Sequence, residues 1–168
     1  MTKLFGVILL LVGFCGLTFE KIREDTEALK EMERIKEFSA YLLNEIEYSH
    51  IPIPDICREY IGRCEGKLKA FLESVCKKYE DNQGKSFDVI WEQELKNYDG
   101  KREEKQWLSK MSKEFGFSNV GMQISAIGQY LTDVEKMILQ KEKKFQENKK
   151  LILYFGIMSG LLISIVLL

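Results

Sequence analysis

Between residues 20 and 150, apolar positions recur at alternating steps of three and four residues along two long segments. In the first segment, 20–48, the apolar or small stripe consists of Ala28, Met32, Ile35, Ser39, Leu42 and Ile46. In the second segment, 119–150, it consists of Val120, Ile124, Ile127, Leu131, Val134 and Ile138. This spacing places the side chains on one face of an α-helix. The pattern therefore predicts two long amphipathic helices.

Four shorter helical patterns lie between the two long ones, separated by glycine and polar residues. They cover residues 55–63, 67–80, 86–98 and 101–115. Ser86 is suited to cap the third of them, and Gly116 can adopt the left-handed conformation that often follows a helix. No segment has the alternation of a β-strand. We predict an all-α, bundle-like domain of six helices over residues 20–150.

Both ends of the chain are apolar. Residues 4–19 follow the single basic residue Lys3, and residues 151–168 contain no charged side chain. As helices they would rise about 24–27 Å, close to the roughly 30 Å thickness of a hydrocarbon layer. We predict transmembrane anchors at 1–19 and 151–168, which would make the two long helices antiparallel. A cleaved signal peptide is the alternative for the first run, although bulky Phe14 before Cys15 favours a retained anchor.

Small residues repeat at every fourth position of the predicted C-terminal anchor, at Gly156, Gly160 and Ser164. Such a face allows another helix backbone to approach closely. The counterparts in the first anchor would be Gly6, Gly13 and Gly16. The alternative is that these glycines reflect only the ordinary composition of membrane helices.

Basic residues indicate the orientation of the two predicted spans. Between them lie five lysines or arginines within residues 21–36 and six lysines within residues 136–150, whereas only Lys3 precedes the first span. The positive-inside rule therefore predicts that the central domain faces the cytoplasm. The lysines before the second span also suit a surface near anionic membrane lipid. A net charge of −1 gives no argument for nucleic acid as a partner.

The stretch 44–55 holds the only histidine, His50, and both prolines, Pro52 and Pro54. Proline disfavours the helical conformation of the residue before it, so we expect Ile51 and Ile53 to be extended. The first long helix should then end near residues 48–49. The next helix should begin at Pro54 or Asp55. We predict that His50 lies in the intervening turn and stabilises it by a hydrogen bond.

No motif in the chain predicts catalysis, a cofactor site or a metal site. The stretch 62–67, GRCEGK, lacks the length, the hydroxyl residue and the preceding strand of a phosphate-binding loop. His50, Cys57 and Cys64 have spacings that match no short zinc motif. His50 is also the only candidate base, with no residue identifiable as its partner. We predict that the protein is not an enzyme and that its cysteines are reduced.

Three local segments resemble the stage III sporulation protein AB family of endospore-forming bacteria. Residues 45–55, EIEYSHIPIPD, are similar to that family's E-I-x-Y segment after the first long helix. Residues 115–123, FGFSNVGMQ, are similar to its L-G-x-x-D-x-x-x-Q segment, with Asn119 in place of the usual Asp. Either residue can cap a helix. Residues 155–163, FGIMSGLLI, are similar to its L-G-x-x-x-G-L-L anchor.

The resemblance implies a role in the sporulation channel complex of the mother-cell membrane around the forespore. It further implies a domain like the cytoplasmic domains of type II secretion and type IV pilus platform proteins. The implied partners are a cytoplasmic secretion-type ATPase and other membrane subunits, and self-association is kept as a further possibility. The alternatives are a membrane-anchored helical spacer and a two-span sensor domain.

Overall fold

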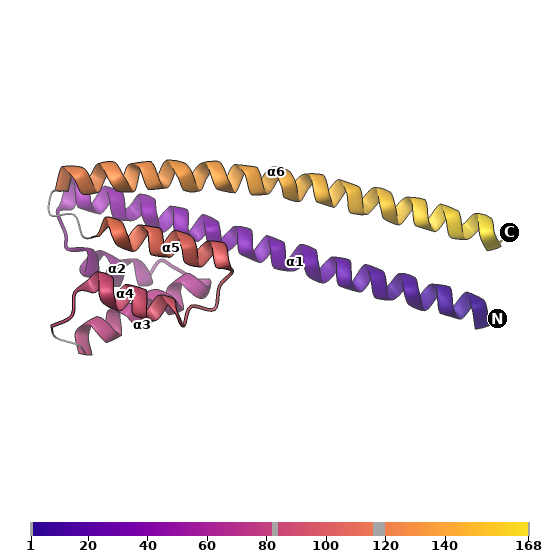
Figure 1. Ribbon diagram of the computed structural model, residues 1–168, viewed down its shortest axis with the longest axis horizontal. Coiled ribbons are helices and arrows are strands. Elements are labelled where there is room, and N and C mark those ends of the chain that lie inside the picture. Colours follow the sequence, from indigo (N-terminus) through magenta and orange to yellow (C-terminus); the bar gives the residue numbers. More distant parts are fainter. Residues whose placement is uncertain (1, 82–83, 116–119, 168) are drawn as a thin grey trace. The chain divides into compact units, whose positions relative to one another are not determined.

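The computed structural model describes residues 2–81, 84–115 and 120–167 and, within these, the side chains of residues 20, 22–151, 154 and 158. Its described residues form six α-helices and one π-helical turn, without a β-strand (Figure 1). In chain order the elements are α1 (Thr2–Asn44), η1 (Glu45–Ser49), α2 (Ile53–Ile61), α3 (Gly66–Asp81), α4 (Phe87–Leu95), α5 (Arg102–Glu114) and α6 (Val120–Leu167). The all-α prediction is confirmed for this part of the chain.

The chain divides into two compact units. Unit 1 contains residues 1–29 and 139–168, and unit 2 contains residues 30–138. Within each unit, the segments of α1 and α6 run in opposite directions (Figure 1). The predicted domain limits at 19/20 and 150/151 mark where the apolar ends of the chain meet its charged middle. They differ from the limits of the two compact units and stay predictions.

The predicted membrane anchors lie largely outside the described side chains. Over the residues that could be assessed, no helix combines the length and the apolar character that crossing a membrane requires. The backbone is helical at Gly156, Gly160 and Ser164, but their side chains lie outside the described part of the structure. The two spans and their small-residue packing face therefore stay predictions.

The apolar stripe of α1 enters the core of unit 2 as predicted. Met32, Ile35 and Leu42 are fully buried there. Three members of the predicted α6 stripe, Ile127, Val134 and Ile138, are buried, whereas Val120 is 47 % exposed. Tyr130, which the predicted stripe did not include, is also buried. Tyr130 packs against the ring of Trp107 and donates its hydroxyl hydrogen bond to the Trp107 carbonyl at 3.0 Å. The prediction for Val120 was wrong, and the contact with Trp107 adds Tyr130 to the buried face of α6.

Trp91 of α4 lies at the centre of an aromatic cluster in unit 2. Its side chain is 0 % exposed, and its ring packs against Phe38, Phe71, Phe87 and Phe115 with centroid distances of 4.8–6.4 Å. These rings come from α1, α3 and α4 and from the end of α5. Successive helices from α2 to α5 also pack against each other in pairs. One aromatic cluster therefore joins most elements of the unit.

Candidate functional site

The turn after α1 is built around His50. The helix widens into the π-helical turn η1 and stops at Ser49, where its end was expected. His50 follows with φ 54° and ψ 30°, a left-handed conformation that is uncommon for residues other than glycine. Its Nδ1 lies 3.2 Å from the carbonyl oxygen of Ile46, a hydrogen bond that requires the Nδ1–H tautomer. The exposed ring thus satisfies one carbonyl at the helix end.

Helix α2 begins one or two residues earlier than expected. Pro52 is its N-cap, and Ile53 is its first helical residue, so the prediction that Ile53 is extended was wrong. The Pro52 carbonyl accepts hydrogen bonds from the amides of Asp55 and Ile56 at 2.9 and 3.1 Å. Pro54 lies in this first turn, where its missing N–H removes no intrahelical hydrogen bond. The closed turn offsets the preference of Ile53 for an extended conformation.

Four other residues were predicted to form turns or caps: Asp55, Ser86, Gly116 and Asn119. The Asp55 carboxylate is exposed and pairs with Arg58 at 2.7 Å. Gly116 and Asn119 lie outside the described residues. Ser86 is the N-cap of α4, but its side chain makes no capping hydrogen bond.

The cysteines of unit 2 are core residues. Cys57, Cys64 and Cys76 are buried and free, whereas His50 is exposed. Burial raises the pKa of the Cys57 and Cys64 thiols, and it raises the pKa of Cys76 to about 11. All three thiols are therefore protonated at neutral pH, so none is activated as a nucleophile. No group of three or more candidate metal ligands occurs among the described residues.

A buried carboxylate on α1 caps the start of α3. Glu31 is 4 % exposed, and its Oε1 accepts hydrogen bonds from the Lys67 amide at 3.1 Å and from Arg34 Nη1 at 2.7 Å. Gly66 precedes this amide with φ 73°. A Cβ atom at Gly66 would lie only 2.3 Å from Glu31 Oε1. Glycine is therefore required by both the backbone conformation and the close approach of Glu31.

A second buried carboxylate, Glu104 of α5, is 2 % exposed and accepts a hydrogen bond from the Tyr98 hydroxyl at 3.2 Å. Burial raises the pKa of Glu104, and the charge of Glu31 adds to that effect. Burial likewise raises the pKa of Tyr98, and the Glu104 charge strengthens the shift. Glu104 thus belongs to a buried cluster in which ionisation is disfavoured.

We expect Glu104→Gln to weaken the pH dependence of stability. Because the folded-state pKa is raised above the ordinary value of 4.5, ionisation of Glu104 destabilises the fold as pH rises through and above that value. Glutamine cannot ionise, so the free energy of unfolding should fall less between acidic and neutral pH. Urea denaturation over that range measures the difference. Exposed Glu73→Gln is the control, and an unchanged pH slope in Glu104→Gln would contradict the prediction.

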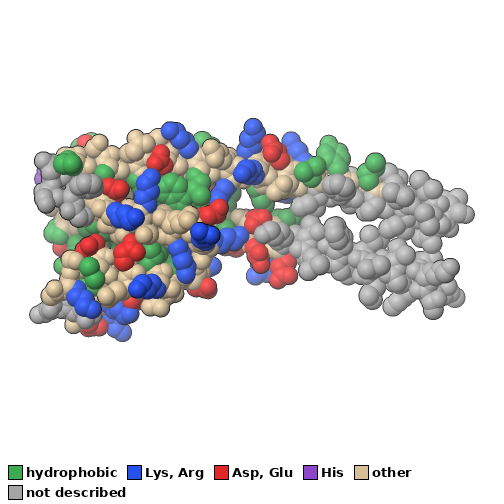
Figure 2. All heavy atoms as spheres, in the orientation of Figure 1, with side chains coloured by type: hydrophobic (Ala, Val, Ile, Leu, Met, Phe, Trp, Pro, Cys, Tyr) green, Lys and Arg blue, Asp and Glu red, His purple; other side chains and the backbone are tan. Residues whose placement is uncertain are grey.

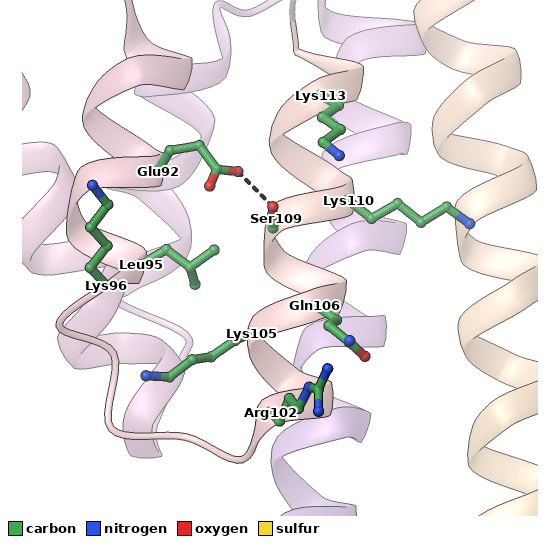
Figure 3. Close-up of a pocket in the computed structure, with 9 residues that line it drawn as sticks. All are labelled: Glu92, Leu95, Lys96, Arg102, Lys105, Gln106, Ser109, Lys110 and Lys113. Atoms are coloured by element: carbon green, nitrogen blue, oxygen red, sulfur yellow. Dashed lines mark hydrogen bonds between the residues drawn. The ribbon is translucent and has the colours of Figure 1, made fainter.

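An open groove between α4 and α5 is lined by several basic side chains. It has a volume of about 480 Å³ (Figure 3). The residues along it are Glu92, Leu95, Lys96, Arg102, Lys105, Gln106, Ser109, Lys110 and Lys113. Acidic and basic side chains are interspersed over the visible face of unit 2 (Figure 2). Because the two signs nearly cancel over the whole chain, the net charge of −1 does not indicate this local basic site.

Two charged residues of the α4–α5 groove are held by partners within unit 2. Glu92 accepts hydrogen bonds from the hydroxyls of Ser109, at 2.9 Å, and Ser112. Lys110 points toward α6 and pairs with Asp133 at 2.8 Å (Figure 3). The other four cations, Lys96, Arg102, Lys105 and Lys113, form no ion pair with a carboxylate in the part of the chain that the structure describes. We take this basic groove as the candidate functional site.

Comparison with known proteins identifies the family. The family model described as "Stage III sporulation protein AB" matches residues 3–168. The chain belongs to the stage III sporulation protein AB family. It is similar to the stage III sporulation protein AB of Bacillus subtilis (strain 168), with 26 % identity over 171 residues that cover 99 % of each protein.

A solved structure of a stage III sporulation protein AB has the same fold. The TM-score is 0.64 at 18 % identity, and the match covers 71 % of this chain and 97 % of the solved one. Membership in the stage III sporulation protein AB family assigns the chain to sporulation and confirms the resemblance drawn from the three sequence segments.

The basic groove of this stage III sporulation protein AB family member was not predicted from the sequence. The KREEK stretch at 101–105 mixes acidic and basic residues, a pattern typical of a solvated helix face. A signal was present in the spacing of Arg102, Lys105 and Lys113, which places three cations along one face of α5. The apolar residues that bury the helix lie elsewhere on it. What the spacing could not reveal is that α4 forms a second wall beside these cations.

Proposed function

We propose that this protein is a non-enzymatic platform of the sporulation channel complex. Two terminal anchors would hold it in the mother-cell membrane around the forespore, with unit 2 in the cytoplasm. There it would dock a cytoplasmic secretion-type ATPase and couple it to the membrane subunits. The observation that carries the proposal is the family match over residues 3–168.

The chemistry of unit 2 supports a docking role over a catalytic one. Its buried thiols have raised pKa values, and exposed His50 has no paired nucleophile or orienting acid in the described structure. Catalysis by a side chain normally requires a nucleophile and a base within hydrogen-bond reach. The well-packed aromatic cluster around Trp91 supports a domain with a defined surface instead of a simple helical spacer.

Binding of the full chain to the sporulation ATPase tests the partner. The chain would be reconstituted in nanodiscs of phosphatidylcholine, a lipid without net charge, and the purified ATPase would be captured on them. We expect stoichiometric capture that empty nanodiscs do not show. If the folded chain captures no ATPase, the platform function is wrong.

The orientation requires a different labelling site from the native cysteines, since Cys57 and Cys76 are buried. Lys77→Cys places a thiol at an exposed position of α3. In intact cells, a membrane-impermeant maleimide should leave this thiol unlabelled and should label it after lysis. Labelling before lysis, above the level of the unsubstituted chain, would place unit 2 outside the cytoplasm.

A further inference from the structure

Three of the four unpaired cations of the α4–α5 groove form a row along α5. Arg102, Lys105 and Lys113 follow one another at steps of three and eight residues, with Ser109 between the last two. These steps keep the side chains on one face of the helix. From residue 102 to residue 113 the helix rises roughly 16 Å at 1.5 Å per residue. The row is therefore about three turns long.

The arrangement suits an elongated anion better than a compact one. Figure 3 shows the charged ends of Lys96, Lys105 and Lys113 at separate points along the groove, not around one centre. A single phosphate is bound by donors that converge on it. A helix with carboxylates at i and i+4 presents its charges at about 6 Å intervals and can follow the row.

The surroundings leave these cations available to a partner. Lys96, Arg102 and Lys113 are exposed, and Lys105 is half-buried. Glu92, the one carboxylate among the groove residues, is already bound by the hydroxyls of Ser109 and Ser112. A carboxylate of a bound segment would thus meet lysines without displacing an existing ion pair. Leu95 adds an apolar side chain between the two helices.

We propose that the α4–α5 groove binds an acidic helical segment of a partner protein, whose carboxylates lie along the cation row of α5. The proposal rests on the platform function, because it locates the surface through which such a platform would hold its partner. It also implies an association that weakens steeply with salt, since exposed charges are screened within about 8–10 Å at physiological ionic strength.

Titration with a model peptide tests the groove directly. The probe is a fluorescent alanine-based helix with glutamate at every fourth position, added to the full chain in phosphatidylcholine nanodiscs. Lys105→Glu combined with Lys113→Glu should weaken its binding by at least about tenfold. The neutral pair Lys105→Gln and Lys113→Gln should show an intermediate loss.

A matched variant separates the groove from general charge. Lys77→Glu combined with Lys85→Glu replaces two exposed lysines that do not line the groove and lowers the net charge equally. We expect this control to bind the peptide within about twofold of the unsubstituted chain. Circular dichroism of all variants should show the same helical content, because every substituted side chain is exposed or half-buried.

Three results would overturn the proposal. The first is an equal loss of peptide binding in the groove variant and the control variant. The second is equal affinity for a peptide of the same composition whose glutamates are scrambled around the helix. The third is groove-dependent binding to phosphatidylglycerol vesicles together with no binding of the peptide, which would assign the groove to lipid headgroups.

The same variants keep this proposal separate from the platform function. If the ATPase is captured by the unsubstituted chain and equally by the Lys105→Glu, Lys113→Glu chain, the platform function stands and the groove assignment fails. Absence of ATPase capture overturns the platform function, whereas the peptide titration contains no ATPase and still reports on the groove. Loss of capture confined to the groove variant would support both.

Discussion

Trp91→Ala is expected to lower the free energy of unfolding by about 3–5 kcal/mol, the usual range for truncating a buried tryptophan. The indole is 0 % exposed and contacts four aromatic rings. Its Nε1–H also donates a hydrogen bond to the Leu108 carbonyl at 2.9 Å. Alanine would remove these contacts and leave a cavity where α1, α3, α4 and α5 meet.

Urea denaturation of the full chain in detergent measures this loss. The fluorescence of Trp107, which the variant retains, reports on unit 2. Tyr48→Ala is the control, because Tyr48 is 73 % exposed and its truncation should change stability by less than about 0.5 kcal/mol. A loss of less than about 1 kcal/mol for Trp91→Ala would show that the aromatic cluster does not hold the unit together.

Gly66→Ala is expected to destabilise the protein by about 2–5 kcal/mol. The left-handed conformation at φ 73° costs about 1–2 kcal/mol for an L residue. The new Cβ would also displace Glu31, with the loss of a buried hydrogen bond and a further cost of about 1–3 kcal/mol. Because Glu31 and Arg34 share this contact, both side chains would have to move.

Gly62→Ala provides the matched control for the same chemical change. Gly62 has φ −67°, and its nearest neighbour would lie 3.7 Å from the added Cβ, an ordinary contact. We expect its stability to stay within about 0.5 kcal/mol of the unsubstituted chain. Equal effects of the two substitutions would show that the Glu31 cap contributes little to folding.

Local signals predicted much of the fold. The stripe of α1 recurs at helical spacing, and its members Met32, Ile35 and Leu42 are all in the core. The prolines marked the connection to α2 correctly because their effect acts on adjacent residues. The predictions for Ile53 and for the first residue of α2 were wrong, because the hydrogen bonds to the Pro52 carbonyl outweigh the preference of one residue.

Features that depend on distant residues could not be predicted in this way. Glu31 and Lys67 are 36 positions apart, and no local pattern links a carboxylate on α1 to an amide in the first turn of α3. The burial of Tyr130 on α6 likewise involves a contact with Trp107, which lies on another helix. The basic groove is lined by residues of both α4 and α5, so the spacing of the cations on α5 could indicate only one of its two walls.

The hydrogen bond between the Lys67 amide and Glu31 also limits how far α1 can slide along α3 within unit 2. A shift of α1 along its axis by one residue would move the Glu31 carboxylate by about 1.5 Å, which is enough to break its 3.1 Å hydrogen bond to Lys67. Glu31 is itself buried beneath Gly66, so the side chain has little room to follow the amide. This hydrogen bond therefore helps to fix the axial register of α1 against α3, and a pull along the unit 2 segment of α1 would strain the cap of α3.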